Sequence, residues 1–479
     1  MARRRASFTG WEGLAFCIGM IGVQLASELI IQWGSYFYAP PPGAGRAALV
    51  SIGLVGAMFV AGRVFDIVVD PLIGAWSDNT GANPSTRRGG FLAGRRRPFL
   101  FWGALLSTVT GIAFWYPPDS SETVRNFVYG TVLLCFHWMF YTLCYVPFHA
   151  LAPEVARSDD DRLRLGRWIA VGMTLGVVVA NVLPGALVTA LDPAPPPNAG
   201  TALASQAGFQ RVAILFAIAA LFCFLFPAFA IRERHGQATE TISRGDAARD
   251  IRAVFRDRAF VRFFVITVLF NIGYLAGQRV IPYWAVVGLG GTEATVTELL
   301  IPFVVTCLLT SAVLPSWAGR RNPRSLLAAS LGILGCALPV LHGIGAMPGG
   351  IATKVLAGQV LMGVVGVAQG MLYVLPLPIL GQIIDRDTQA TGRRREAVYN
   401  GVYAVAWKAG AVLSIVLSTQ TMDWLGNSKE SPLGVLVVGP IGGAFAWAAF
   451  ALNVLPDKGS QPAAQTAVNP SPSERDNHP

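Results

Sequence analysis

Long apolar segments recur along the whole chain, and short polar connections separate them. A helix satisfies its own backbone hydrogen bonds, so about 20 apolar residues in helical form can span the hydrocarbon of a bilayer. Apolar runs of this length predict twelve transmembrane helices. We place them at residues 13–38, 47–76, 99–116, 127–150, 168–191, 209–231, 259–287, 296–317, 326–344, 351–380, 398–419 and 433–455.

The composition agrees with this pattern. Hydrophobic residues make up 53% of the 479 residues and charged residues 13%, whereas an ordinary soluble domain holds about 25% charged residues. A water-soluble chain of this length could not bury so much apolar surface. The sequence therefore predicts an all-α membrane protein in contact with membrane lipid.

The longest cytoplasmic connection, residues 232–258, is polar and divides the predicted spans into six and six. Two helix bundles that move about a site at mid-membrane are typical of transporters. We predict an N-terminal six-helix bundle at 1–231, a cytoplasmic linker at 232–258 and a C-terminal six-helix bundle at 259–455. Residues 456–479 are rich in Pro, Ser, Ala and Gln and are predicted to form a disordered cytoplasmic tail.

Most basic residues lie on one side of the predicted spans. The termini and the connections on their side hold 29 of the 37 Lys and Arg residues. Because cytoplasmic loops retain Lys and Arg during insertion, we predict a multi-pass protein of the cytoplasmic (inner) membrane with both termini in the cytoplasm. The net charge of +10 is spread over short loops, which argues against nucleic-acid binding. The opposite connections are assigned Arg46, Arg125, Arg211, Arg279, Lys354 and Lys429.

The sequence carries no pattern typical of an enzyme. It has no P-loop, its histidines lack acid partners at suitable spacing, and its six cysteines show no metal-ligand spacing. We therefore predict that the protein is not an enzyme and needs no cofactor beyond a coupling ion.

Three charged residues lie on one face of the second predicted helix. Arg63, Asp66 and Asp70 are spaced i, i+3 and i+7, so their side chains project together. Two carboxylates one turn apart offer hard oxygen ligands to Na⁺, and two close carboxylates can also share a proton. The alternatives are a structural ion pair with Arg63 or a cap by Asp70 before Pro71, although one Arg cannot neutralise two acids.

Lys408 lies near the middle of predicted span 398–419. A charged side chain at mid-membrane costs about 3 kcal/mol when it has no partner. Asp66 and Asp70 are the expected partners across the bundle interface, and such a pair would couple the two halves. Snorkelling of Lys408 to a lipid headgroup is the alternative.

Polar and aromatic residues form stripes at steps of four residues on two spans. Gln24, Glu28 and Gln32 lie on the first span, and a His137 to His149 stripe on the fourth contains two tyrosines. We predict that such stripes line a cavity in which aromatic faces pack on a ligand and polar tips hydrogen-bond it. Polar packing between helices is the alternative. The substrate-binding candidates are Gln24, Glu28, Tyr141, Tyr145, His149, Arg167, Tyr403 and Trp407.

Four segments in order resemble the glycoside-pentoside-hexuronide:cation symporters of the major facilitator superfamily. They are residues 63–74, 94–98, 146–154 and 385–396, and the likeness runs over most of the chain. The resemblance implies the major facilitator fold, with twelve transmembrane helices in two six-helix bundles.

The resemblance also implies roles for several residues. In that family the two acids of the second helix bind the coupling cation together with a threonine of the fourth, which here means Asp66, Asp70 and Thr142. A lysine of the eleventh helix lies beside that site and matches Lys408. The family has an asparagine where this chain has Val69, so both Na⁺ and H⁺ stay open as the coupling ion.

The sugar-binding side departs from the family pattern. Acids that bind sugar hydroxyls in the family align with Gln24 and Tyr145, and a tryptophan aligns with His149. The family resemblance also reaches carriers of lysophospholipids, which have a less charged cavity.

We predict a secondary active transporter that carries a small solute, a sugar or glycoside, in symport with Na⁺ or H⁺ by alternating access. The cation site is Asp66, Asp70 and Thr142, with Lys408 and Arg63 as coupling residues, and the carrier is expected to be a monomer. The alternatives are a carrier of an amphipathic or lysolipid-like substrate, or an exporter. A membrane enzyme or flippase that uses the His and Tyr stripe, and a passive channel, fit the residues less well.

Overall fold

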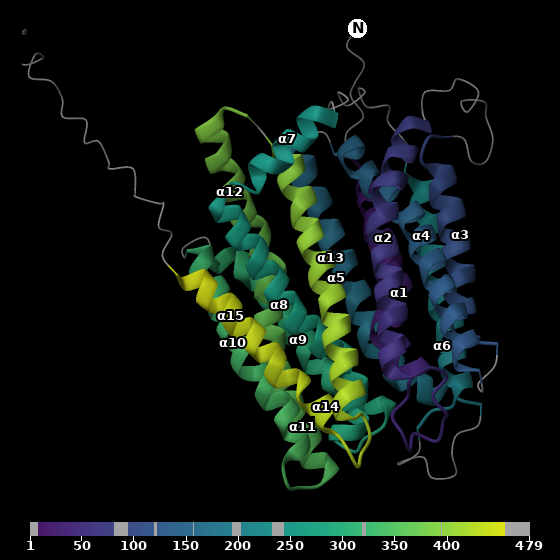
Figure 1. Ribbon diagram of the computed structural model, residues 1–479. Helices are drawn as coiled ribbons and strands as arrows, with labels where there is room; N and C mark the ends of the chain where they lie inside the picture. The colour runs from purple at the N-terminus through teal and green to yellow at the C-terminus, as the bar shows by residue number, and fades with distance from the viewer. Residues whose placement is uncertain are drawn as a thin grey trace, which may run out of the picture.

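In the computed structural model the chain forms a bundle of long, roughly aligned helices (Figure 1). The structure describes residues 8–80, 94–118, 122–156, 158–193, 203–231, 244–318, 322–393 and 395–455. Within these ranges every regular element is a helix, and twelve helical spans are long and apolar enough to cross a membrane. The prediction of an all-α, multi-pass membrane protein is confirmed. The predicted tail, 456–479, lies outside the described residues.

The first half of the bundle consists of six long helices. The first begins at a capping box, in which the Thr9 and Glu12 side chains each accept a hydrogen bond from the other residue's backbone N–H. The helices are α1 (Gly10–Tyr38), α2 (Ile52–Asn79), α3 (Arg97–Phe114), α4 (Thr123–Val155), α5 (Asp159–Ala190) and α6 (Gln206–Ala230).

The second half follows a short helix, α7 (Arg244–Val254), which lies at the opposite end of the molecule from α14 (Figure 1). The α7 segment falls within the connection predicted as a linker. The remaining elements are α8 (Arg258–Tyr283), the π-helical turn η3 (Trp284–Gly288), α9 (Glu293–Ala318), α10 (Pro323–Gly343), the 3₁₀ turn η4 (Ile344–Ala346), α11 (Ile351–Val374), α12 (Pro376–Thr391), α13 (Glu396–Leu425), α14 (Leu433–Leu436) and α15 (Val438–Val454).

The tenth predicted span differs from the structure. Residues 351–380 were expected to form one helix, but α11 ends at Val374 and α12 begins at Pro376 and continues to Thr391. Proline lacks a backbone N–H and clashes with the preceding turn, so it is favoured at the start of a new helix. The apolar pattern continues across this break because both helices remain partly buried.

Three helix pairs hold the two halves together: α2 with α13, α5 with α9, and α1 with α8. Small residues permit the close approach of the backbones. A Cβ atom on Gly56 of α2 would overlap the Thr419 side chain of α13. A Cβ atom on Gly185 of α5 would lie 2.5 Å from the Glu293 carbonyl oxygen of α9.

The buried apolar residues show where the halves touch. At the end of the molecule that holds α14, one continuous apolar cluster includes residues from both halves, among them Trp33, Phe209 and Trp284. At the end that holds α7, the second half and the first half have separate clusters. We name these the α14 end and the α7 end. The halves are therefore packed together at the α14 end and apart at the α7 end.

Candidate cation site and central cavity

The acids of α2 lie at the boundary between the two halves. The Asp66 side chain is 6% exposed and the Asp70 side chain 29% exposed. Their i, i+4 spacing places both carboxylates on the face of α2 that turns toward α4 and α13. Arg63, one turn earlier, places Nη1 3.7 Å from Asp66 Oδ2 and stacks its guanidinium 3.8 Å from the ring centre of Trp138.

Two further side chains complete this charged cluster. The Thr142 hydroxyl of α4 lies 3.1 Å from Asp66 Oδ1 and 2.8 Å from Asp70 Oδ1, so it can donate to either carboxylate. The Lys408 ammonium of α13 donates to Asp66 Oδ2 at 3.1 Å and also to Asp70 Oδ2. Lys408 belongs to the C-terminal half, whereas the other members belong to the N-terminal half. The cluster therefore joins the halves through one ammonium group.

The geometry suits a small cation. Each carboxylate has one oxygen at the Lys408 ammonium and the other at the Thr142 hydroxyl, and hard oxygen ligands of this kind bind Na⁺ or accept a proton. The two acids are balanced by Lys408 and Arg63, which removes much of the cost of holding charge away from water. A cation that enters must compete with the Lys408 ammonium for the same oxygens.

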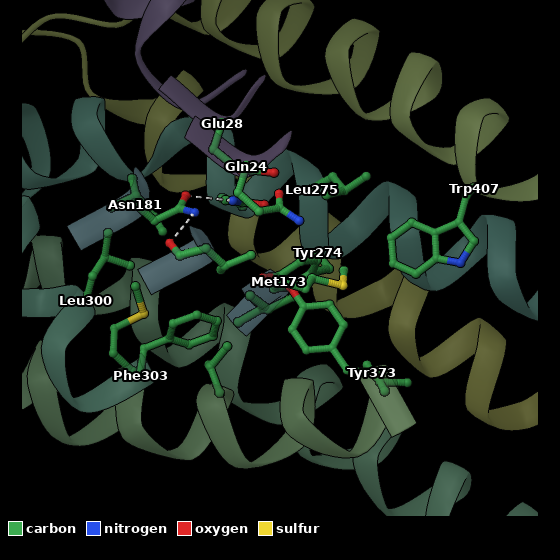
Figure 2. A pocket seen from close by; sticks show the side chains of 18 of the residues that line it. Gln24, Glu28, Met173, Asn181, Tyr274, Leu275, Leu300, Phe303, Tyr373 and Trp407 are labelled. Atoms are coloured by element: carbon green, nitrogen blue, oxygen red, sulfur yellow. Dashed lines mark hydrogen bonds between the residues drawn. The ribbon is translucent and has the colours of Figure 1, made fainter. Parts of the chain in front are cut away.

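A central cavity of about 570 Å³ lies beside this charged cluster, and Lys408, a member of the cluster, also lines the cavity. Its polar wall comes from α1, α5 and α8: Figure 2 shows Gln24, Glu28 and Asn181 close together at one side of the cavity. The Gln278 amide of α8 donates to Asn181 Oδ1 at 3.2 Å. This contact also joins the two halves, between α5 and α8.

Aromatic residues of α13 form another part of the wall. Tyr403 and Trp407 line the cavity, and the Trp407 indole N–H donates to the Tyr403 hydroxyl at 2.8 Å. The walls from α9, α10 and α11 are mostly apolar, with Leu300, Leu338 and Met362 as examples. The cavity thus offers a few polar groups on one side and a wide apolar surface on the other. Since the shared apolar cluster closes the α14 end, we infer that the cavity opens toward the α7 end.

The α4 candidates lie elsewhere. Tyr141, Tyr145 and His149 stack along α4, with ring centres 5.5 Å and 4.3 Å apart in that order, and none of them lines the central cavity. The ring nitrogens of His137 lie 3.1 Å from two backbone carbonyl oxygens, which pins α4 to α3 and α1. Arg167 is exposed near the start of α5, away from the cavity wall. The structure thus groups Gln24, Glu28, Tyr403 and Trp407 around the cavity and leaves these other residues outside it.

Three polar residues between the halves were not predicted from the sequence to lie there. Arg279, assigned to an outer loop, lies inside α8 and is 3% exposed. Asn181 and Gln278 were not singled out, although both line the cavity. The position of Arg279 within the predicted span 259–287 was a usable signal. Amides within apolar helices are common, and only tertiary packing reveals that Asn181 and Gln278 meet.

The fold and this interface define a membrane transporter of the major facilitator class, with two six-helix bundles around a central cavity. Residues 15–432 match the family described as MFS/sugar transport protein, and the chain belongs to that family. The resemblance to glycoside-pentoside-hexuronide:cation symporters is thereby confirmed. The chain is thus a member of a family of transporters, not of enzymes.

Comparisons with individual proteins agree with this family. YagG of Escherichia coli strain K12, assigned as a glycoside/cation symporter, is 32% identical over 134 residues, which cover 28% of this chain and 26% of YagG. The isoprimeverose transporter of Lactiplantibacillus pentosus is 21% identical over 85% of this chain and 80% of its own length. The crystal structure of the nucleoside transporter NupG matches 94% of this chain and all of NupG with a TM-score of 0.62 at 11% identity. At that identity, NupG shows the shared fold alone.

Proposed function

We propose that this protein is a secondary active symporter that couples Na⁺ or H⁺ to the transport of a sugar or glycoside by alternating access. The observation that carries the proposal is the contact of Lys408, from one half, with Asp66 and Asp70 of the other. A cation in this site would weaken the attraction between Lys408 and the acids. Its binding would therefore change which arrangement of the halves is favoured.

In this scheme Asp66, Asp70 and Thr142 bind the cation, and Arg63, 3.7 Å from Asp66, orients that carboxylate. Substrate binds in the central cavity. Gln24 and Glu28 meet its hydroxyl groups, while the aromatic rings of α13 pack on its apolar face. Tyr141, Tyr145, His149 and Arg167 remain predicted contacts for another state of the cycle.

We further propose that the α7 end faces the cytoplasm, in a cytoplasmic membrane, and that a monomer is the working unit. The basic residues near α7 support this orientation, because cytoplasmic loops retain Lys and Arg. The cavity would then open inward. Labelling of a cysteine introduced at exposed position 249 by an impermeant reagent checks the orientation: it should react in inverted vesicles and be protected in intact cells.

The cation site can be tested without knowing the substrate. We expect Na⁺, compared with choline, or a change of pH to shift the melting temperature of the purified protein, because ligands of the folded state stabilise it. The double variant D66N/D70N should abolish the shift and the gradient-driven uptake of glycosides into proteoliposomes. The matched control is D160N/E430Q, which removes two exposed acids. Uptake by D66N/D70N that equals the parent protein would refute the scheme.

A second candidate substrate class is favoured by one observation, the mostly apolar walls from α9, α10 and α11. An amphipathic or lysolipid-like molecule would place its polar head near Glu28 and its tail along Leu338 and Met362. A thermal-stabilisation screen of nitrophenyl glycosides, free sugars and lysophospholipids separates the two classes. Stabilisation by lysophospholipids alone would replace the sugar proposal with this one.

A further inference from the structure

Helix α8 is fastened to the first half by three successive polar contacts. Gln278 donates to Asn181 of α5, Arg279 Nη1 donates to the Ile31 carbonyl of α1 at 3.0 Å, and the Tyr283 hydroxyl donates to the Ala39 carbonyl at 2.8 Å. The series runs from the central cavity, which Gln278 lines, to the apolar cluster of the α14 end, which contains Tyr283. The three contacts must break or change if the α14 end is to open.

Arg279 is the charged member of this series. Its guanidinium is buried and lies 5.6 Å from the ring centre of Phe59, and its Nε has no hydrogen-bond partner among the described residues. A carbonyl oxygen satisfies one N–H of the group but leaves its charge without a salt bridge. Separation of α8 from α1 would remove that carbonyl, and a buried guanidinium without any acceptor is strongly unfavourable.

Glu28 lies on α1 one helical turn before Ile31. Its carboxylate faces the central cavity, forms no salt bridge within the described part of the chain, and lies close enough to Arg279 and Arg63 to feel their charges. Glu28 is thus an acid without a salt-bridge partner, and it lies near Arg279, whose guanidinium donates to a backbone carbonyl rather than to a carboxylate.

The order of these groups along α1 matters. Two rigid halves that rock about the middle of the membrane separate most at the α14 end and least near the central cavity. Ile31 lies toward the α14 end and Glu28 toward the cavity, as their positions along α1 require. Arg279 can therefore lose Ile31 and still reach Glu28.

We propose that Arg279 exchanges partners during the transport cycle: it holds the Ile31 carbonyl when the α14 end is closed and pairs with the Glu28 carboxylate when that end opens. A substrate that enters the open cavity and hydrogen-bonds Glu28 then releases Arg279, which returns to Ile31 and closes the α14 end. Substrate recognition and closure are linked through one acid and one base. The inference rests on the alternating-access part of the proposed function.

The test measures the opening of the α14 end directly. Spin labels at exposed positions 124 and 429, one in each half at that end, report a short distance when it is closed and a longer one when it is open. The native cysteines are replaced in this background. The variants are E28Q, R279Q and the double variant E28Q/R279Q. The matched control is R211Q, because Arg211 also donates to a backbone carbonyl at 3.0 Å, but within one half.

The exchange predicts that the effect of E28Q depends on Arg279. E28Q removes the partner that Arg279 needs in the open state, so the long-distance population should fall about tenfold relative to the short one. R279Q removes the Arg279 contacts of both states, so Glu28 has no partner left to lose and E28Q/R279Q should show the same ratio as R279Q. R211Q should leave the parent ratio unchanged.

Other outcomes separate this inference from the function on which it rests. No shift in E28Q, or an equal shift by E28Q in the presence and absence of Arg279, would overturn the partner exchange while two distances in the parent protein still support alternating access. A single distance in the parent, with and without Na⁺ and glycosides, would instead refute alternating access. A merely structural role of Glu28 would lower the melting temperature of E28Q without a change in the distance populations that depends on Arg279.

Discussion

At the scale of single residues, Thr142 has an unusual position because one hydroxyl lies within hydrogen-bond distance of two carboxylates. It has a single proton to donate, so it can satisfy Asp66 or Asp70 but not both at once. Its lone pairs remain available to a cation. In the proposed site this residue is both a ligand and the group that sets the spacing of the two acids.

Replacement of Thr142 tests this role. T142A should weaken the apparent affinity for the coupling cation about tenfold, because it removes one ligand and one hydrogen bond to a charged group. T142S should retain most of the affinity. The cation concentration that gives half-maximal uptake or half-maximal thermal stabilisation is the measurement.

Thr131 provides the matched control on the same helix, since its hydroxyl donates to the Phe127 carbonyl of α4 rather than to a carboxylate. T131A should leave the cation dependence unchanged. Equal cation dependence in T142A and the parent protein would remove Thr142 from the site.

Charge was the most informative residue-level signal in the sequence. Asp66, Asp70 and Lys408 could be singled out because a charge inside an apolar span is costly and needs a partner. Lys408 of α13 contacts Asp66 and Asp70 of α2. From the sequence, these two acids could be proposed as its partners only because they are also charged groups inside a predicted span. Arg279 was missed because it was counted with the loop charges rather than within its own apolar span.

At the scale of helices, the contact of α5 with α9 depends on the absence of a side chain at Gly185. The backbone of α9 lies so close that a methyl group would press on the Glu293 carbonyl, a backbone atom that cannot turn aside. Thr297 strengthens the same contact, since its hydroxyl donates to the Val182 carbonyl at 2.6 Å and accepts from the Ala186 N–H at 2.9 Å. The close packing of α5 against α9 therefore helps to hold the two halves together at the α14 end.

A methyl group at this contact should open it. Overpacking costs about 1–3 kcal/mol, so G185A should raise the open population of the α14 end by about fivefold or more, as measured with the spin labels at positions 124 and 429. Gly166 lies on the same helix with no neighbouring atom within 4 Å of an added Cβ, so G166A is the control. Equal distance distributions for G185A and the parent would show that this contact does not limit opening.

Three of the sequence motifs join helices near the α7 end. Glu154 accepts from Arg95 and lies 3.1 Å from Arg96 Nη1, which joins residues 94–98 to residues 146–154. Arg395 pairs with Asp250 of α7 and Asp387 of α12. The motifs were visible in the sequence, but their partners depend on how the helices pack. The break between α11 and α12 was missed for a related reason: apolar content alone does not mark where a helix ends.

At the scale of the whole molecule, the described residues place the halves in one state of the proposed cycle. The α14 end is shut by the shared apolar cluster and by hydrogen bonds such as that from the Tyr36 hydroxyl to Glu293 Oε1 at 3.0 Å. A carrier must leave this state to complete a cycle. A covalent bridge between the halves at the α14 end would prevent it from doing so.

Cysteines at positions 186 and 297 provide such a bridge, because the Ala186 N–H donates to the Thr297 hydroxyl across the interface. We expect crosslinking by a short bifunctional reagent to reduce glycoside uptake to the level of empty vesicles. A reagent with a reducible spacer should restore uptake after reduction. Each single-cysteine variant, treated in the same way, is the control, and undiminished uptake by the crosslinked protein would contradict alternating access.

The number and order of the spans, and the division into six and six, could be predicted because a bilayer forces long apolar helices on the chain. The closed end could not be predicted. It depends on which faces of α5 and α9 or of α1 and α8 meet, and helix interfaces within a membrane are as apolar as the surfaces that face lipid. The periodicity of apolar residues along a helix therefore does not distinguish a face that packs on another helix from a face that contacts lipid.

In the proposed cycle, the pairing of opposite charges between the halves has a consequence for the response to voltage. Arg63 and Lys408 balance Asp66 and Asp70, so the cation site of an empty carrier would reorient without moving net charge. A loaded carrier would carry one additional positive charge, on which the membrane potential acts with about 2.3 kcal/mol for each 100 mV. An inside-negative potential would then drive the loaded step inward and leave the return of the empty carrier almost unaffected.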